Sequence, residues 1–94
     1  MTKAIKNKWV KALRSGKYKQ TSGSFCREVE GKLCYCVIGV LALVAKIPVS
    51  PDITSNYTSV QEILDKDLMW KFISLNDKDG ETFVQLADIV DDLV

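Results

Sequence analysis

Apolar and basic positions alternate along the first 15 residues with the period of a helix. Ile5, Trp9 and Leu13 recur at every fourth position, so they share one face of an α-helix. Lysines fill many of the other positions, and Gly16 stands where a helix typically ends. We therefore expect a helix over residues 3–15, with Trp9 in the core rather than at a binding surface.

A second amphipathic pattern closes the chain. Its apolar positions share one helical face and are Phe83, Leu86, Ala87 and Val90. Thr82 and Gln85 have the T-x-x-Q spacing of a capping box, in which each side chain bonds the other residue's backbone N–H. Thr2 is a candidate cap for the first helix. We expect the closing helix to extend to about residue 93.

The longest apolar run, CVIGVLALVA, covers residues 36–45. A membrane span needs roughly 20 apolar residues, so this run predicts a buried central helix over residues 36–46. Its β-branched residues also permit a strand. Gly39 costs a helix roughly 1 kcal/mol relative to alanine, and we expect another backbone to pack closely against it.

Short elements fill the intervening segments. We expect a loop over residues 17–23, followed by a β-hairpin whose strands cover residues 24–29 and 32–35 and whose turn is Glu30–Gly31. The two prolines predict an irregular loop over residues 47–58.

A second capping box, S-x-x-E from Ser59 to Glu62, predicts a helix that ends near residue 66. The next segment, DLMWKFISLND, is ambiguous, and its first half favours a helix. Residues 76–81, NDKDGE, indicate a turn in which the polar side chains bond locally. The pattern as a whole predicts an α+β fold in a single small domain, residues 1–94.

The net charge of +1 conceals an uneven distribution. Residues 1–47 carry ten basic and two acidic residues, whereas residues 48–94 carry three basic and ten acidic residues. This division favours a polarised surface or self-association of a basic face with an acidic face, with chance as the remaining explanation. A 94-residue chain buries only a modest core, so we expect a homo-oligomer.

The chain has three cysteines and no histidine. Cys26, Cys34 and Cys36 supply three soft ligands without the fourth that a structural zinc site needs, so we expect no metal and buried free thiols. The absence of histidine excludes Ser–His and Cys–His nucleophiles. The odd cysteine count and a start without a signal peptide favour a reducing cytoplasm. We expect no enzyme and no cofactor.

The segment KWVKALRSGKYKQTSGSF, residues 8–25, is basic, contains no acidic residue and is rich in hydroxyl groups. Charge-assisted hydrogen bonds and a flat ring suit a phosphate-bearing ligand, although a solvated basic loop is the simpler alternative. The candidate ligand-binding residues are Arg14, Lys17, Tyr18, Lys19, Gln20, Ser22 and Arg27. Thr21 and Ser24 add possible donors.

Three segments resemble a family of small uncharacterised phage and prophage proteins. These segments are WVKALRSGKYKQ, YCVIGVL and LNDKDGETFVQLADIV, and together they cover about a third of the chain. The family pattern reads W-x-x-A-L-R-S-G-x-Y-x-Q, then C-C-L-G-V-L, then L-N-D with F-x-x-I-A-D. This chain departs from it at Val37, where the family has a second cysteine.

The resemblance implies a phage accessory protein that acts in the cytoplasm of the host cell. By analogy with other small phage proteins, the leading hypothesis is a counter-defence protein that sequesters a phosphate-bearing nucleotide immune signal. Three alternatives stay open: inhibition of a host defence protein by direct contact, nucleic-acid binding, and enzymatic degradation of a nucleotide signal. None of these hypotheses includes a membrane.

Overall fold

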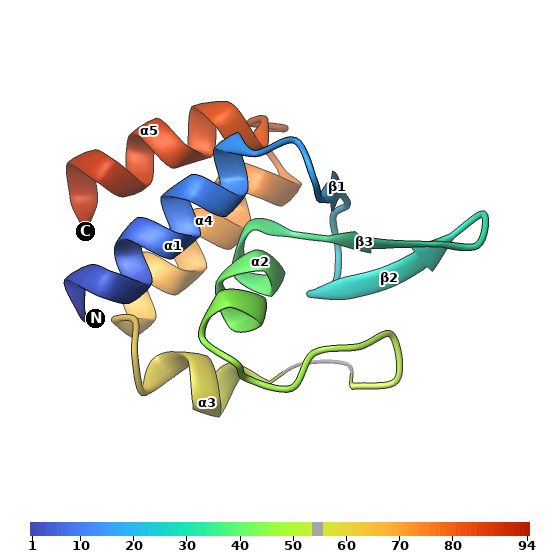
Figure 1. Cartoon of the computed structure of the whole chain (residues 1–94), viewed down its shortest axis with the longest axis horizontal. Coiled ribbons are helices and arrows are strands. Elements are labelled where there is room, and N and C mark those ends of the chain that lie inside the picture. The colour runs from blue at the N-terminus through green and yellow to red at the C-terminus, as the bar shows by residue number, and fades with distance from the viewer. Residues whose placement is uncertain (54–55) are drawn as a thin grey trace.

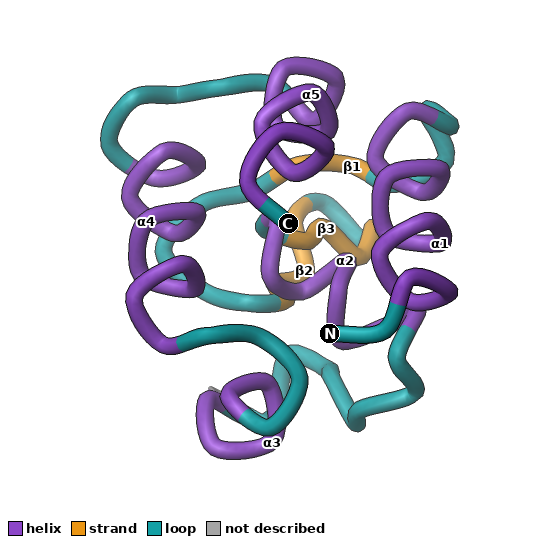
Figure 2. Tube along the Cα trace, turned by 90° about the vertical axis from the view of Figure 1, so that its left-hand side faces the viewer, coloured by secondary structure: helices purple, strands orange, loops and turns teal. Residues whose placement is uncertain are grey.

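Helix α2 (Val37–Val44) lies at the centre of the fold, with the other helices around it (Figures 1 and 2). The computed structural model describes residues 1–53 and 56–94. In chain order, the remaining elements are α1 (Lys3–Arg14), β1 (Lys19–Gln20), β2 (Cys26–Val29), β3 (Lys32–Tyr35), α3 (Tyr57–Gln61), α4 (Lys66–Asp77) and α5 (Phe83–Leu93). The predicted α+β class and the helices at both ends are confirmed.

The first and last helices begin where their capping residues predict. The Thr2 side chain accepts a hydrogen bond from the backbone N–H of Ile5, and the capping box of Thr82 and Gln85 is formed in both directions. Each cap satisfies backbone donors that a helix terminus leaves unpaired. Helices α1 and α5 pack against each other, and their apolar faces meet the core.

The central apolar segment is a helix, as expected, and not a strand. The Cys36 side chain caps α2 by accepting a hydrogen bond from the backbone N–H of Gly39. A methyl group at Gly39 would collide with the backbone carbonyl of Phe25. The predicted close approach of another backbone is therefore confirmed, and glycine is the residue that permits it.

The predicted hairpin is confirmed, and the structure adds a strand. Strands β2 and β3 pair antiparallel, and their turn has positive φ angles at Glu30 (52°) and Gly31 (79°), as a tight hairpin turn requires. The expected loop over residues 17–23 contains β1, which pairs parallel with β3. The prediction of a loop throughout was therefore wrong. A strand of two residues is too short to show an alternating pattern, which is why the sequence did not indicate it.

Two predictions in the second half of the chain were also wrong. Ser59 does not cap a helix, because α3 already begins at Tyr57 and ends at Gln61. The Asp65 side chain starts a new helix by accepting hydrogen bonds from the first backbone N–H groups of α4. The single helix expected from Ser59 to residue 66 is thus divided, and α4 runs through the whole ambiguous segment to Asp77.

Trp9 belongs to the core, as predicted. Its ring is fully buried and lies edge-on to Phe72, with ring centroids 5.3 Å apart. Its Nε1–H donates to the backbone carbonyl of Val37 at 3.0 Å, which satisfies the polar atom of a buried tryptophan. All three cysteines are buried and unbridged, so they pack as small apolar side chains.

Candidate ligand site

Three lysines surround a hollow on the surface of α1, which we call the lysine hollow. Its volume is about 260 Å³, and it is lined by Lys8, Lys11, Ala12, Ser15, Lys17, Tyr18 and Val44. The first four of these residues have the spacing i, i+3, i+4 and i+7, so they form one stripe along the helix. The last three come from the loop after α1 and the end of α2.

A tight turn brings the loop back onto α1. Gly16 has a φ angle of 74°, a left-handed conformation that suits glycine and ends the helix. The Ser15 hydroxyl donates to the backbone carbonyl of Ala12 at 2.7 Å and accepts from the backbone N–H of Lys17 at 3.2 Å. These two bonds reverse the chain and place Lys17 and Tyr18 beside the stripe.

The floor of the lysine hollow is apolar and supported from below. Ala12 is buried and Val44 is half-buried. Tyr18 is half-buried against the core and lies edge-on to Tyr35 with ring centroids 5.8 Å apart. Tyr35 is neutral near pH 7, since burial raises its pKa above an ordinary value that is already 10.0. The Tyr18 ring is therefore held in place without any charge beneath it.

The positive charge of the lysine hollow is not neutralised within the molecule. Lys8, Lys11 and Lys17 are exposed, and no carboxylate lines the hollow. Across residues 1–53 and 56–94, the ion pairs present belong to Arg14. Like charges that share one hollow repel each other, and a bound anion relieves that repulsion.

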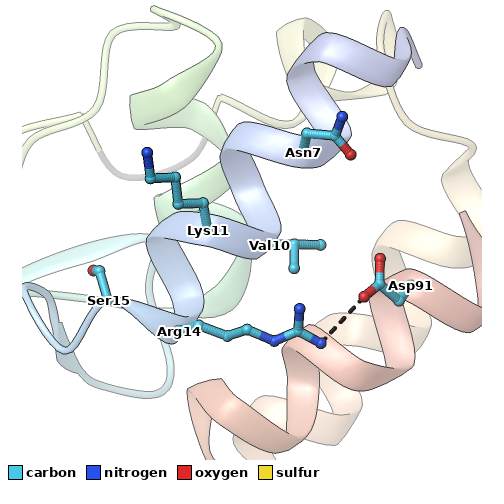
Figure 3. Close-up of a pocket in the computed structure, with 6 residues that line it drawn as sticks. All are labelled: Asn7, Val10, Lys11, Arg14, Ser15 and Asp91. Atoms are coloured by element: carbon cyan, nitrogen blue, oxygen red, sulfur yellow. Dashed lines mark hydrogen bonds and ion pairs between the residues drawn. The ribbon is translucent and has the colours of Figure 1, made fainter.

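Whereas Lys11 points away from α5, Arg14 points toward it (Figure 3). Its Nη2 atom lies 2.8 Å from Oδ1 of Asp88 and 3.1 Å from Oδ2 of Asp91. The hydrogen bond to Asp88 is the main reason that the pKa of Arg14 is raised. Arg14 and Asp91 line a wide hollow between α1 and α5, which adjoins the lysine hollow and shares Lys11 and Ser15 with it. Arg14, although a predicted ligand residue, lies outside the lysine hollow and links two helices.

The side chain of Gln20 is occupied by the protein itself. Its Nε2 atom donates to Oδ1 of Asn76 at 2.9 Å and to the backbone carbonyl of Glu81 at 2.7 Å. Its Oε1 atom accepts from the backbone N–H of Phe83 at 3.1 Å. Gln20 and Ser22 border a shallow depression away from the lysine hollow. The geometry gives Gln20 a structural role.

The remaining predicted residues are dispersed. Lys19 is exposed on β1 and Arg27 is exposed on β2, and neither lines the lysine hollow. Of the seven predicted ligand residues, the structure brings together Lys17 and Tyr18. Sequence reasoning missed Lys8 and Lys11, although their spacing with Ser15 on the wet side of α1 was a readable signal.

The thiol groups offer little nucleophilic character. Burial raises the pKa of Cys36 from its ordinary value of 9.0 to about 11, and burial also raises the pKa of Cys26. The thiolate is the reactive form of cysteine, so both groups are protonated near neutral pH. Within residues 1–53 and 56–94, no group of three or more histidine, cysteine or acidic side chains could hold a metal ion.

In the part of the chain that the structure describes, every helix is too short or too polar to cross a bilayer.

One comparison with known proteins identifies a family. A family model described as "Domain of unknown function (DUF8296)" matches residues 1–47, which is half of the chain. The matched segment contains α1, the sheet and α2, and every residue that lines the lysine hollow falls within it. No curated protein and no solved structure matches the chain significantly.

Proposed function

The chain belongs to the DUF8296 family, and we propose that it binds a small phosphate-bearing ligand in the lysine hollow. The observation that carries this proposal is that Lys8, Lys11 and Lys17 all line one hollow, which has an apolar floor and no carboxylate in its lining. Surface lysines paired with carboxylates contribute little to binding. Lysines that lack such partners and share a concave site are available to an anion.

The lining divides into two chemically different parts. The three ammonium groups suit the oxygens of a phosphate, since lysine binds phosphate as a compact point charge with three donors. The ring of Tyr18 and the side chain of Val44 suit a flat or apolar portion of the same molecule. A nucleotide combines both parts. The volume of about 260 Å³ is close to the lower end of the roughly 300–1,000 Å³ of small-molecule sites, which favours a ligand of mononucleotide size.

The biological role that we propose follows from the resemblance to small phage proteins. A phage accessory protein that binds a host nucleotide signal without turnover withdraws it from the effector that the signal activates. This role places the protein in the cytoplasm of the host cell and requires a high ratio of protein to signal. Direct inhibition of a host defence protein and degradation of the signal remain the competing roles.

The test begins with a panel of nucleotides and nucleotide-type signals. Each is incubated with the protein, the protein is heat-denatured, and the released compound is analysed intact. Recovery of unchanged ligand supports sequestration, whereas recovery of a degradation product supports the enzymatic alternative. Recovery of nothing above the level of a lysozyme control contradicts the proposal.

Variants of the lysine hollow then assign the site. Lys8→Gln and Lys17→Gln should each weaken binding in calorimetric titration by at least about tenfold, because each removes a charge-assisted contact. Lys19→Gln is the matched control, since Lys19 is exposed but lies outside the hollow. An affinity equal to that of the unaltered protein in Lys8→Gln and Lys17→Gln, as in the Lys19→Gln control, would exclude this site.

Nucleic-acid binding is the second candidate, because exposed lysines continue along α1 beyond the hollow. Lys3 is exposed near the start of the helix and does not line the lysine hollow. A polyanion that follows the helix would contact it, whereas a small ligand in the hollow would not. Lys3→Gln together with a steep dependence of affinity on salt concentration separates the two candidates.

A further inference from the structure

A second, smaller pocket lies where α4 meets α3, the start of α2 and the loop before β2. Its volume is about 30 Å³, and it is lined by Ser24, Phe25, Cys36, Tyr57, Ile73 and Asp77, together with Gly23. We call it the aromatic pocket. None of its lining residues lines the lysine hollow, so what it binds is independent of the function proposed above.

Aromatic rings form one wall of the pocket and continue to the surface. Tyr57 lies edge-on to the buried ring of Phe25, with ring centroids 4.9 Å apart. On the other side, Tyr57 stacks with Trp70 at 5.2 Å and an interplanar angle of 29°. Trp70 is 44% exposed, which is unusual for the largest apolar side chain. The three rings thus connect the core to solvent beside the pocket.

The polar atoms of the pocket are mainly acceptors. Asp77 is the one charged residue in its lining, and across the described residues no lysine or arginine forms an ion pair with it. Its Oδ1 atom accepts a hydrogen bond from Asn76 Nδ2 at 2.8 Å, and the negative charge of the carboxylate is not neutralised by that bond. The Ser24 hydroxyl gives its hydrogen to the backbone carbonyl of Cys26 at 3.3 Å, so its oxygen keeps free lone pairs. The pocket therefore matches a group that donates hydrogen bonds and carries positive charge.

From this combination we propose that the aromatic pocket binds a primary alkylammonium group. A carboxylate beside aromatic rings attracts a cation through both its charge and the ring quadrupoles. The ammonium group has three donors and no acceptor, which complements the lining. The volume of about 30 Å³ exceeds the roughly 10–15 Å³ that a group of the size of one water molecule needs, so it admits one such head group, and the alkyl stem lies along the ring of Tyr57, which lines the pocket.

The other charged side chains of α4 lie outside the aromatic pocket. Lys66 and Lys71 are exposed on α4, and Lys78 is exposed at its C-cap. None of these lysines lines the pocket. Asp67 is exposed as well, one turn before Trp70, and it also lies outside the lining. Asp67 is therefore a matched control for Asp77: both are exposed carboxylates on α4, and one of them faces the pocket.

The test uses n-butylammonium chloride as the probe and n-butanol as the uncharged probe of the same shape. Isotope-labelled protein is titrated with each probe, and the amide shifts of residues 23–25, 57 and 77 are followed by NMR. We expect saturable shifts with the ammonium and none with the alcohol. Asp77→Asn should weaken binding at least about tenfold, because it removes a hydrogen bond to a charged group, whereas Asp67→Asn should leave the affinity unchanged.

A third probe, a short peptide with one central lysine and blocked ends, identifies the source of the ammonium group. Tighter binding than n-butylammonium assigns the pocket to a lysine of a partner protein, and equal or weaker binding assigns it to a free amine. Equal shifts with the alcohol, full affinity in Asp77→Asn with a wild-type melting temperature, or no shift with any probe would show that the pocket holds only water.

Discussion

Gln20 and Asn76, which are 56 positions apart, join their side-chain amides through a hydrogen bond of 2.9 Å from Nε2 to Oδ1. The same Asn76 oxygen accepts from the backbone N–H of Val37 at 3.1 Å, and Asn76 Nδ2 donates to the backbone carbonyl of Thr21 at 2.9 Å. Asn76 is the buried polar residue of the described core. Its amide therefore holds α4, the start of α2 and the end of β1 together.

Replacement of Asn76 by alanine should destabilise the protein by roughly 3 kcal/mol, because it leaves several buried donors and acceptors without partners. The measurement is the free energy of unfolding from urea titration monitored by circular dichroism. Asn7→Ala is the control, since Asn7 is exposed on α1, and it should change stability by less than about 0.5 kcal/mol. Similar losses for both variants would contradict the role of this amide.

Gly39→Ala should also destabilise the protein, against the usual trend. Alanine in place of glycine normally stabilises a helix by roughly 1 kcal/mol. In α2, however, the added methyl group would meet the backbone carbonyl of Phe25, which no side-chain rotation can relieve. A lower melting temperature for Gly39→Ala is the expected outcome, and an increase would mean that the backbone of Phe25 and α2 are farther apart than described.

The two tryptophans should differ in their contribution to stability. Trp9 is fully buried and hydrogen-bonded to the backbone of α2, so Trp9→Ala should cost roughly 3–5 kcal/mol. Trp70 is 44% exposed, and Trp70→Ala should cost clearly less. Chemical denaturation of both variants measures the difference. A larger loss for Trp70 would reverse the assignment of core and surface.

The thiol of Cys36 should make stability fall at high pH. Burial raises its pKa from 9.0 to about 11 in the folded protein, so above pH 9 the unfolded chain releases a proton that the folded chain retains. The stabilising contribution is complete below pH 9 and is lost as the pH rises to about 11, by roughly 2–3 kcal/mol. Cys36→Ser keeps a capping side chain without this titration. Unfolding titrations from pH 8 to pH 11 should therefore show a shallower decline for the variant.

Self-association remains a prediction, but the structure weakens the argument for it from opposite charges. Arg14 pairs with two aspartates of α5, and the Lys6 ammonium donates to the backbone carbonyls of Asp91 and Val94. Part of the charge attraction between the two halves of the chain thus acts within one molecule. We still expect a dimer or a larger assembly from the small core, and a monomer mass by light scattering at high micromolar concentration would refute it.

Local signals predicted the fold best where one residue decides one feature. The period of Ile5, Trp9 and Leu13 identified α1, the capping box of Thr82 identified α5, and Gly39 identified a close contact between backbones. The prediction from the S-x-x-E pattern at Ser59 was wrong, because such a pattern indicates only that a cap can form there. Asp65 offered a competing cap six residues later, and the chain uses that one.

Features that depend on distant contacts were not predictable in this way. Asn76 was assigned to a turn with local bonds. It lies in α4, and besides a local bond to Asp77 it bonds two distant segments, residues 20–21 and the start of α2. Gln20 was predicted to contact a ligand through its side-chain amide, but that amide bonds Asn76 in the same network. The lysine hollow was only partly anticipated, because Val44 reaches it from α2 and no spacing in the sequence brings α2 beside residue 17.

The hydrogen bonds of Asn76 and the packing of the helices both join the first half of the chain to the second. The family match ends at residue 47, but α1 packs on α5 and α2 packs on α4, so neither half can bury its apolar surface alone. The connection between the halves runs through a proline-containing loop. Two peptides separated after Pro51 should therefore be disordered individually and reconstitute the native fold on mixing, which makes this chain suitable for an engineered split protein whose reassembly reports on ligand binding.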